Sequence, residues 1–187
     1  MKLKTLVLLI FLLPQSVYPS FNFGTYVPYF LKSQSDKEAG TTKFALNPFI
    51  SYDYHLFTMR SQKFTPEAGF VYHFDAEDST THQTIFLLYN FEYNWSETVD
   101  LRYGFGTFLN RISGDGSTLT LNNGSSTSDF YVPDELQTSY TSSFNLGLKI
   151  NVTSNWFLRL DTQIMRFASS TRRNLSYLLS VSRNQME

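Results

Sequence analysis

The fold is decided by one alternating stretch, VDLRYGFGTFLN, residues 99–110. Every second residue from Val99 is apolar, aromatic or threonine, and the residues between them are mainly charges, glycines and an amide. A period of two residues is typical of a β-strand, whose side chains alternate between two faces. The stretch therefore predicts a strand with an apolar face toward lipid and a polar face toward the lumen of a barrel.

A short basic start and an apolar run open the chain. Lys2 and Lys4 precede the apolar residues 5–13, and Pro14 ends the run. This run is too short to span a bilayer as a helix, and its order is typical of a secretory signal peptide. We expect a signal peptide over residues 1–20, with cleavage near Ser20, and one barrel domain over residues 21–187. The alternative for the first residues is a buried N-terminal strand.

Composition excludes several classes of protein. The chain has no cysteine, so neither disulfides nor a lipidated cysteine can hold it. Without Lys2 and Lys4, 13 basic side chains stand against 16 acidic ones, which argues against a nucleic-acid partner. No stretch after residue 20 approaches the roughly 20 apolar residues of a transmembrane helix. If the chain is integral to a membrane, it must therefore form a closed barrel.

The alternation recurs along the chain and predicts eight strands. They are expected at residues 21–32, 44–54, 63–74, 83–93, 98–112, 139–152, 155–167 and 175–182. Tight connections at 94–97 and 153–154 alternate with longer polar ones at 33–42, 75–82 and 113–138. This is the pattern of an all-β, eight-stranded, antiparallel, up-and-down transmembrane β-barrel. The connection 55–62 is an exception, because it is longer and more apolar than a periplasmic turn should be.

The longest connection carries a signal of its own. Residues 118–121 alternate and then meet Asn123-Gly124, a dipeptide that favours a hairpin turn. We expect a small hairpin standing above the barrel, and the alternative is an irregular loop.

Aromatic residues gather near the tight connections. Aromatic rings with a polar edge prefer the level where the bilayer meets water, so we expect an interface girdle at this end. The alternative is that these are ordinary core aromatics. The girdle residues are Tyr52, Tyr93, Trp95 and Trp156.

The polar face carries charges that would point into the lumen. An eight-stranded barrel is only wide enough for its side chains to fill it, so these charges must pair. Because acids outnumber bases, some acids should be hydrated, protonated or bonded to hydroxyls. The expected lumen charges are Asp53, Glu67, Glu92, Asp100, Arg102, Lys149, Arg159 and Asp161.

With these features the chain resembles the small eight-stranded outer-membrane barrels typified by the membrane domains of outer-membrane proteins A and X. The resemblance implies a plugged or narrowly conducting interior and a location in the bacterial outer membrane. It also implies contact with outer-membrane lipid and lipopolysaccharide, and assembly by the outer-membrane insertion machinery. Such barrels usually end on an aromatic residue, whereas this chain ends on the polar run SRNQME, residues 182–187.

No catalytic or metal site is expected. The three histidines, His55, His73 and His82, lack metal-ligand spacing, and no cofactor is predicted. Arg166, Arg172 and Arg173 near the last outer loop could pair with lipid phosphates.

The expected role is structural, adhesive or narrowly porin-like, with an unidentified extracellular ligand. One alternative is an outer-leaflet hydrolase, which would need a hydroxyl within reach of His73 or His82. Another is an exported soluble barrel with its apolar face turned inward onto a hydrophobic ligand. That alternative fails if Asp100, Arg102, Arg159 and Asp161 are shielded from solvent.

Overall fold

The computed structural model describes residues 19–28, 46–74, 80–122, 127–169 and 173–184. Most of the expected signal peptide and the outer parts of several connections therefore lie outside the described residues. The barrel strands are β1 (Pro19–Val27), β2 (Asn47–Tyr54), β4 (Gln62–Tyr72), β5 (Thr81–Asn94), β6 (Val99–Ser113), β9 (Gln137–Asn151), β10 (Trp156–Met165) and β11 (Asn174–Asn184). No helix within the described residues could cross a bilayer.

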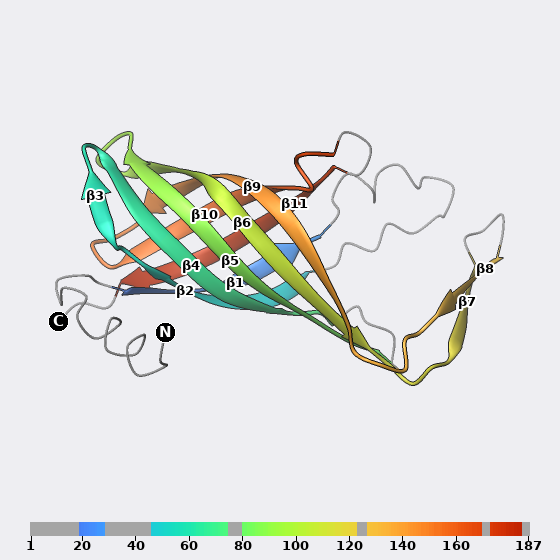
Figure 1. Cartoon of the computed structure of the whole chain (residues 1–187). Helices are drawn as coiled ribbons and strands as arrows, with labels where there is room; N and C mark the ends of the chain where they lie inside the picture. Colours follow the sequence, from blue (N-terminus) through green and yellow to red (C-terminus); the bar gives the residue numbers. More distant parts are fainter. Residues whose placement is uncertain (1–18, 29–45, 75–79, 123–126, 170–172, 185–187) are drawn as a thin grey trace, which may run out of the picture.

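These strands form one closed barrel (Figure 1). Each strand is antiparallel to its neighbours in the order β2-β1-β11-β10-β9-β6-β5-β4, and the β2–β4 pairing closes the ring. The first and last strands pair along their length, with Ser20 opposite Asn184. Closure leaves no open sheet edge, as a wall in hydrocarbon requires. The prediction of an eight-stranded antiparallel barrel is confirmed, with strand ends shifted by a few residues.

A β-bulge explains the apolar connection after β2. Here β3 (Phe57–Met59) continues β2 and also pairs with β4. Asp53 lies opposite Glu67 whereas Phe57 lies opposite Phe64, so the register gains one residue between the two pairs. The extra residue turns Phe57 to the outer face, where it stacks on Phe64 at 5.1 Å. The expectation of an unusually long turn is therefore wrong, because only Arg60 and Ser61 connect β3 to β4.

The expected hairpin is present in the longest connection. β7 (Thr118–Asn122) pairs with β8 (Thr127–Tyr131), and the pair stands beyond the barrel end opposite β3 (Figure 1). Before it, the backbone N–H of Ser117 donates to Asp115 Oδ1 at 3.0 Å, and Gly116 takes a left-handed φ of 76°. Hydrogen bonds from Ser117 also lower the pKa of the Asp115 carboxyl. The Asn123-Gly124 turn lies outside the described residues.

The outer surface of the barrel wall is apolar. Outward side chains such as Phe23, Ile50 and Leu146 are 52%, 65% and 48% exposed. A soluble protein does not leave such a band to water, whereas a lipid-facing barrel requires it. Asp100, Arg102, Arg159 and Asp161 are at most 6% exposed on the opposite face. The alternative of a soluble barrel with its apolar face turned inward is therefore wrong.

A layer of buried, mainly apolar side chains lies in the half of the lumen toward the hairpin. Rings and aliphatic side chains from most of the strands meet there, and Phe86 packs against Phe49 and Phe108 at centroid distances of 5.9 and 5.4 Å. Gly69 leaves room for this layer, since a Cβ at Gly69 would lie 2.1 Å from Phe86 Cζ. The layer comprises Tyr26, Phe49, Val71, Phe86, Leu88, Phe108, Met165 and Leu178.

The contact between Gly69 and Phe86 gives a prediction of stability. Gly69→Ala should lower the free energy of unfolding by about 1–3 kcal/mol, because the added methyl overpacks the fully buried Phe86 ring. Urea unfolding in lipid vesicles, followed by the gel shift between folded and heated protein, measures the change. The control Ala68→Val, on the exposed face of the same strand, should have little effect, and Phe86→Leu should restore the Gly69→Ala barrel. Equal free energies of unfolding for Gly69→Ala and Ala68→Val would contradict the packing argument.

Candidate functional site

Two arginines form the centre of a buried charge network in the other half of the lumen. Arg102 on β6 places Nη2 at 3.1 Å from Glu67 Oε2 and Nη1 at 2.6 Å from Asp161 Oδ2. Arg159 on β10 places Nη2 at 2.7 Å from the same Glu67 oxygen and at 2.9 Å from Asp161 Oδ2. Both carboxylates are thus shared by both guanidinium groups. All four side chains are at most 1% exposed.

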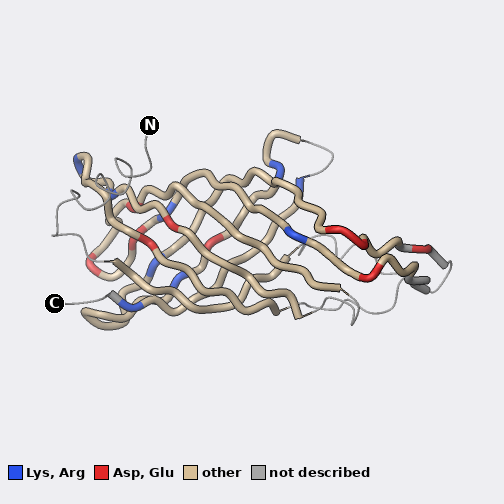
Figure 2. Tube along the Cα trace, turned by 60° about the horizontal axis from the view of Figure 1, so that its bottom comes forward, with Lys and Arg blue, Asp and Glu red and all other residues tan. Residues whose placement is uncertain are grey.

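Three further charges extend the network toward the barrel wall. Arg102 Nε lies 3.0 Å from Glu92 Oε1, and the Lys149 ammonium donates to Glu92 Oε2 at 3.2 Å. On the far side, Arg159 Nη1 lies 3.1 Å from Asp53 Oδ2. The network therefore joins five strands, β2, β4, β5, β6 and β10, and Lys149 adds β9. Figure 2 shows charged residues gathered in this half of the barrel wall.

The network has more carboxylates than cations, and uncharged side chains donate further hydrogen bonds to the carboxylates. The Ser51 hydroxyl donates to Glu67 Oε1 at 2.5 Å, and the Asn90 amide donates to Glu67 Oε2 at 3.4 Å. The Asn22 amide donates to Asp53 Oδ2 at 3.2 Å. A buried carboxylate is costly without such bonds, so the polar residues around the network are part of its stability.

The structure brings together most of the residues that the sequence singles out for the lumen. Ion pairs connect Glu67, Glu92, Arg102, Lys149, Arg159 and Asp161 with Asp53. Asp100 is separate. It is 6% exposed and accepts a hydrogen bond from the Asn94 amide at 3.0 Å, and no described cation lies within ion-pair distance of it.

The apolar layer of the lumen is not among the features predicted from the sequence. Phe86 and Leu88 share the inward face of β5 with Glu92, and Phe108 shares that of β6 with Arg102. Inward positions recur at every second residue of a strand. Continuing the inward positions of β5 and β6 toward the hairpin end would therefore have predicted these side chains. Most outward positions are equally apolar, which hides the layer from a reading of hydrophobicity alone.

Two histidines lie together at the hairpin end of the lumen. The His73 and His82 rings stack at 3.6 Å, and His73 Nε2 lies 2.8 Å from the Thr84 hydroxyl oxygen. A hydroxyl is thus within reach, as a hydrolase would need. However, Thr84 donates its proton to Asn110 Oδ1 at 2.7 Å, so His73 donates to Thr84 rather than accepting from it. The hydroxyl is also buried, with Thr84 only 1% exposed.

Within the described residues, no cluster of three or more metal-binding side chains occurs. His55 lies apart from the other histidines and its Nε2 is 2.9 Å from the Thr58 hydroxyl.

The aromatic residues expected at the interface lie at the end with the short turns. Tyr52, Tyr93, Trp95 and Trp156 are 40%, 39%, 66% and 36% exposed, so their rings face outward. The Arg183 guanidinium lies 5.6 Å from the Trp156 ring. That these four aromatic residues form a girdle at the membrane interface remains a prediction.

The arginines of the last outer loop lie apart from the lumen network. The Arg173 guanidinium donates to the Phe167 carbonyl at 3.0 Å, while Arg166 is exposed in a turn with φ of 52°. Arg172 lies outside the described residues, and lipid phosphate remains a predicted partner of this loop.

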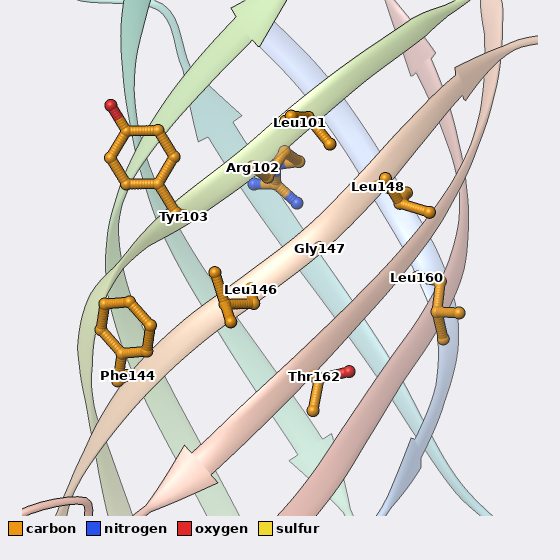
Figure 3. A pocket seen from close by; sticks show the side chains of 9 residues that line it. All are labelled: Leu101, Arg102, Tyr103, Phe144, Leu146, Gly147, Leu148, Leu160 and Thr162. Atoms are coloured by element: carbon orange, nitrogen blue, oxygen red, sulfur yellow. The ribbon is translucent and has the colours of Figure 1, made fainter. Parts of the chain in front are cut away.

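The outer wall also carries a hollow of about 570 Å³ across β6, β9 and β10 (Figure 3). Leu146, Leu148 and Leu160 line it, with the Thr162 hydroxyl as a polar group on the same surface. Arg102 contributes to its base, but its guanidinium belongs to the lumen network. The hollow thus lies in the lipid-facing surface, on the other side of the wall from the charges.

Comparisons with known proteins give likeness of structure only. No protein-family model matches the chain, and no curated protein matches it. The attachment invasion locus protein Ail of Yersinia pestis is 12% identical over 90% of this chain and 97% of that one, with a TM-score of 0.47. Neisserial surface protein A is 17% identical over 89% and 94%, with a TM-score of 0.47. The N-terminal β-barrel domain of Pseudomonas aeruginosa OprF is 16% identical over 91% and 98%, with a TM-score of 0.40.

The wall itself shows what kind of barrel this is. Eight antiparallel strands close on themselves, the exterior is apolar, and most charged side chains of the lumen pair with one another. In a bilayer core only such closure satisfies the backbone of a β-sheet. The chain is an eight-stranded β-barrel of the type that spans the bacterial outer membrane.

Proposed function

We propose that this barrel is a sealed membrane scaffold that displays its outer loops, and that its role is structural or adhesive rather than porin-like. The observation that supports the proposal is that two sets of buried side chains lie in the lumen, one above the other. The charge network around Arg102 and Arg159 lies in one half, and the apolar layer around Phe86 and Phe108 lies in the other. A hydrated ion would have to displace both, and the rings and aliphatic side chains of the second layer are poor substitutes for its water shell.

The outer end supplies the surface that such a scaffold would display. The β7–β8 hairpin is joined to the barrel through paired backbone groups, with Val132 N–H donating to the Ser117 carbonyl at 2.8 Å. Gly114 N–H donates to the Pro133 carbonyl at 2.7 Å, so both sides of the stalk are tied together. The hairpin therefore presents a defined structure for a partner outside the cell. Outer-leaflet hydrolysis is the weaker candidate, since the hydrogen-bond direction at His73 opposes it.

The double seal predicts the conductance of the barrel. Wild type and the single variants Arg102→Ala and Phe108→Ala should show no steady unitary current in planar bilayers, because at least one layer remains in each. The double variant Arg102→Ala/Phe108→Ala should conduct ions, since both layers are then opened. Tyr103→Ala, on the lipid-facing side of the same strand, is the matched control and should stay closed. A steady unitary current through wild type would refute the sealed lumen.

Removal of Arg102 also leaves Glu67, Glu92 and Asp161 short of a cation. The single variant should therefore lose about 3–5 kcal/mol of stability, the usual cost of breaking a buried ion pair. Urea unfolding in vesicles measures this loss, and the gel shift of unheated protein confirms that each bilayer sample is folded. A loss below that of Tyr103→Ala would show that the network does not hold the barrel together.

Display by the hairpin is tested by removing it. A laboratory bacterium carrying the barrel with residues 118–131 replaced by a short Gly-Ser turn should attach less to plastic and to cultured mammalian cells than one carrying the full chain. The unheated gel shift should be retained, because the hairpin lies outside the barrel wall. Equal attachment of the two strains, at equal surface amounts, would rule out an adhesive role for the hairpin.

A further inference from the structure

A polar pocket of about 480 Å³ opens at the end of the lumen that carries the short turns. Its walls come from the β5–β6 connection and the β9–β10 connection, and inward side chains of β4, β6, β9 and β10 line it. We call this pocket the inner vestibule. Lys149 lines the vestibule and pairs with Glu92, which in turn pairs with Arg102, so the vestibule adjoins the charge network.

The charges that line the inner vestibule do not pair with one another. Lys63 and Lys149 supply two cations, and Glu97 and Asp100 supply two carboxylates. Among the described residues, no carboxylate lies within ion-pair distance of Lys63, and no cation lies within that distance of Asp100 or Glu97. Asp100 is nevertheless 94% buried by the side of the pocket, with the Asn94 amide as its hydrogen-bond donor.

Lys149 explains why Asp100 has no cation. The two residues face each other across β6 and β9, but the Lys149 ammonium turns to Glu92 at 3.2 Å and lies 4.5 Å from the Phe157 ring centre. A carboxylate so buried is stable only if a positive group approaches it or its remaining oxygen is hydrated. The vestibule is the side from which such a group can come.

The walls of the vestibule are held in place before any ligand arrives. Asn151 N–H donates to the Thr98 carbonyl at 2.8 Å, and the Asn151 amide donates to the Glu97 carbonyl at 3.3 Å. These bonds tie the two turns together. The backbone N–H groups of Asn155 and Trp156 both donate to the Thr153 hydroxyl, which orders the second turn. A preorganised pocket loses less entropy on binding than a mobile one.

We propose that the inner vestibule binds a small zwitterion, an amino acid or a short peptide, with its ammonium on Asp100 and its carboxylate on Lys63. Lys149 is already paired with Glu92, so the vestibule offers a ligand the unpaired Lys63 ammonium and the buried Asp100 carboxylate. A zwitterion meets both groups, whereas an anion such as phosphate or a simple cation meets only one. The volume suits a ligand of this size. This binding is separate from the display of the outer loops and does not require the lumen to conduct.

The test uses the full chain in lipid nanodiscs and three dipeptides. Dialanine carries both charges, N-acetyl-dialanine lacks the ammonium, and dialanine amide lacks the carboxylate. Dialanine should give saturable NMR shifts of the backbone amides at residues 97–100. Each analogue should bind about 10-fold more weakly or worse, since a hydrogen-bonded charge pair is lost. Absence of saturable shifts, or equal affinity for all three dipeptides, would overturn the proposal without any variant having to fold.

Variants then assign the two ends of the ligand. Asp100→Asn should weaken dialanine about as much as acetylation does, and acetylated ligand should lose nothing further on that variant, because the same contact is already gone. Lys63→Gln should behave in the same way toward the amide. Glu135→Gln, an exposed charge change at the opposite end of the barrel, is the control and should bind as wild type. Wild-type affinity in both vestibule variants would refute the assignment.

Discussion

The rest of the structure depends on two guanidinium groups that share two carboxylates inside a closed wall. Arg102 and Arg159 approach each other only because Glu67 and Asp161 lie between them, at distances of 2.6 to 3.1 Å. Burying each charge costs desolvation free energy. The ion pairs offset that cost only if the partners stay in place. Because the partners sit on β4, β6 and β10, the network also fixes the relative positions of strands that are not neighbours.

The small radius of an eight-stranded barrel requires its inward side chains to pack against one another. The lumen has room for side chains and for little else, so some of the large inward residues lie opposite a glycine. Asp161 lies against Gly147, where a Cβ would come within 2.0 Å of Oδ1, and Leu88 lies against Gly106 in the same way. Glycines on the inward face therefore decide where the long side chains fit. The charged half and the apolar half of the lumen obey the same rule of packing.

Much of this architecture is readable from the chain, and what is missed has physical causes. Alternation predicts all eight strands and the hairpin, because the direction of a side chain on a strand depends only on its position in sequence. The bulge between β2 and β3 is not readable, since one added residue leaves no mark in composition and shows only when β4 is set beside it. The direction of the Thr84 hydrogen bond likewise depends on Asn110, which is on another strand.

The sequence by itself determined which side chains face the lumen and which face lipid. Both faces follow from a period of two, whose physical origin is the pleat of the strand. Only the tertiary structure decided which inward charges pair. Asp100 stands opposite Lys149 on the neighbouring strand, yet Lys149 pairs with Glu92 and leaves Asp100 to the vestibule. Pairing depends on where long side chains meet across a closed barrel, and closure relates residues far apart in the chain, so that choice cannot be read from any one strand.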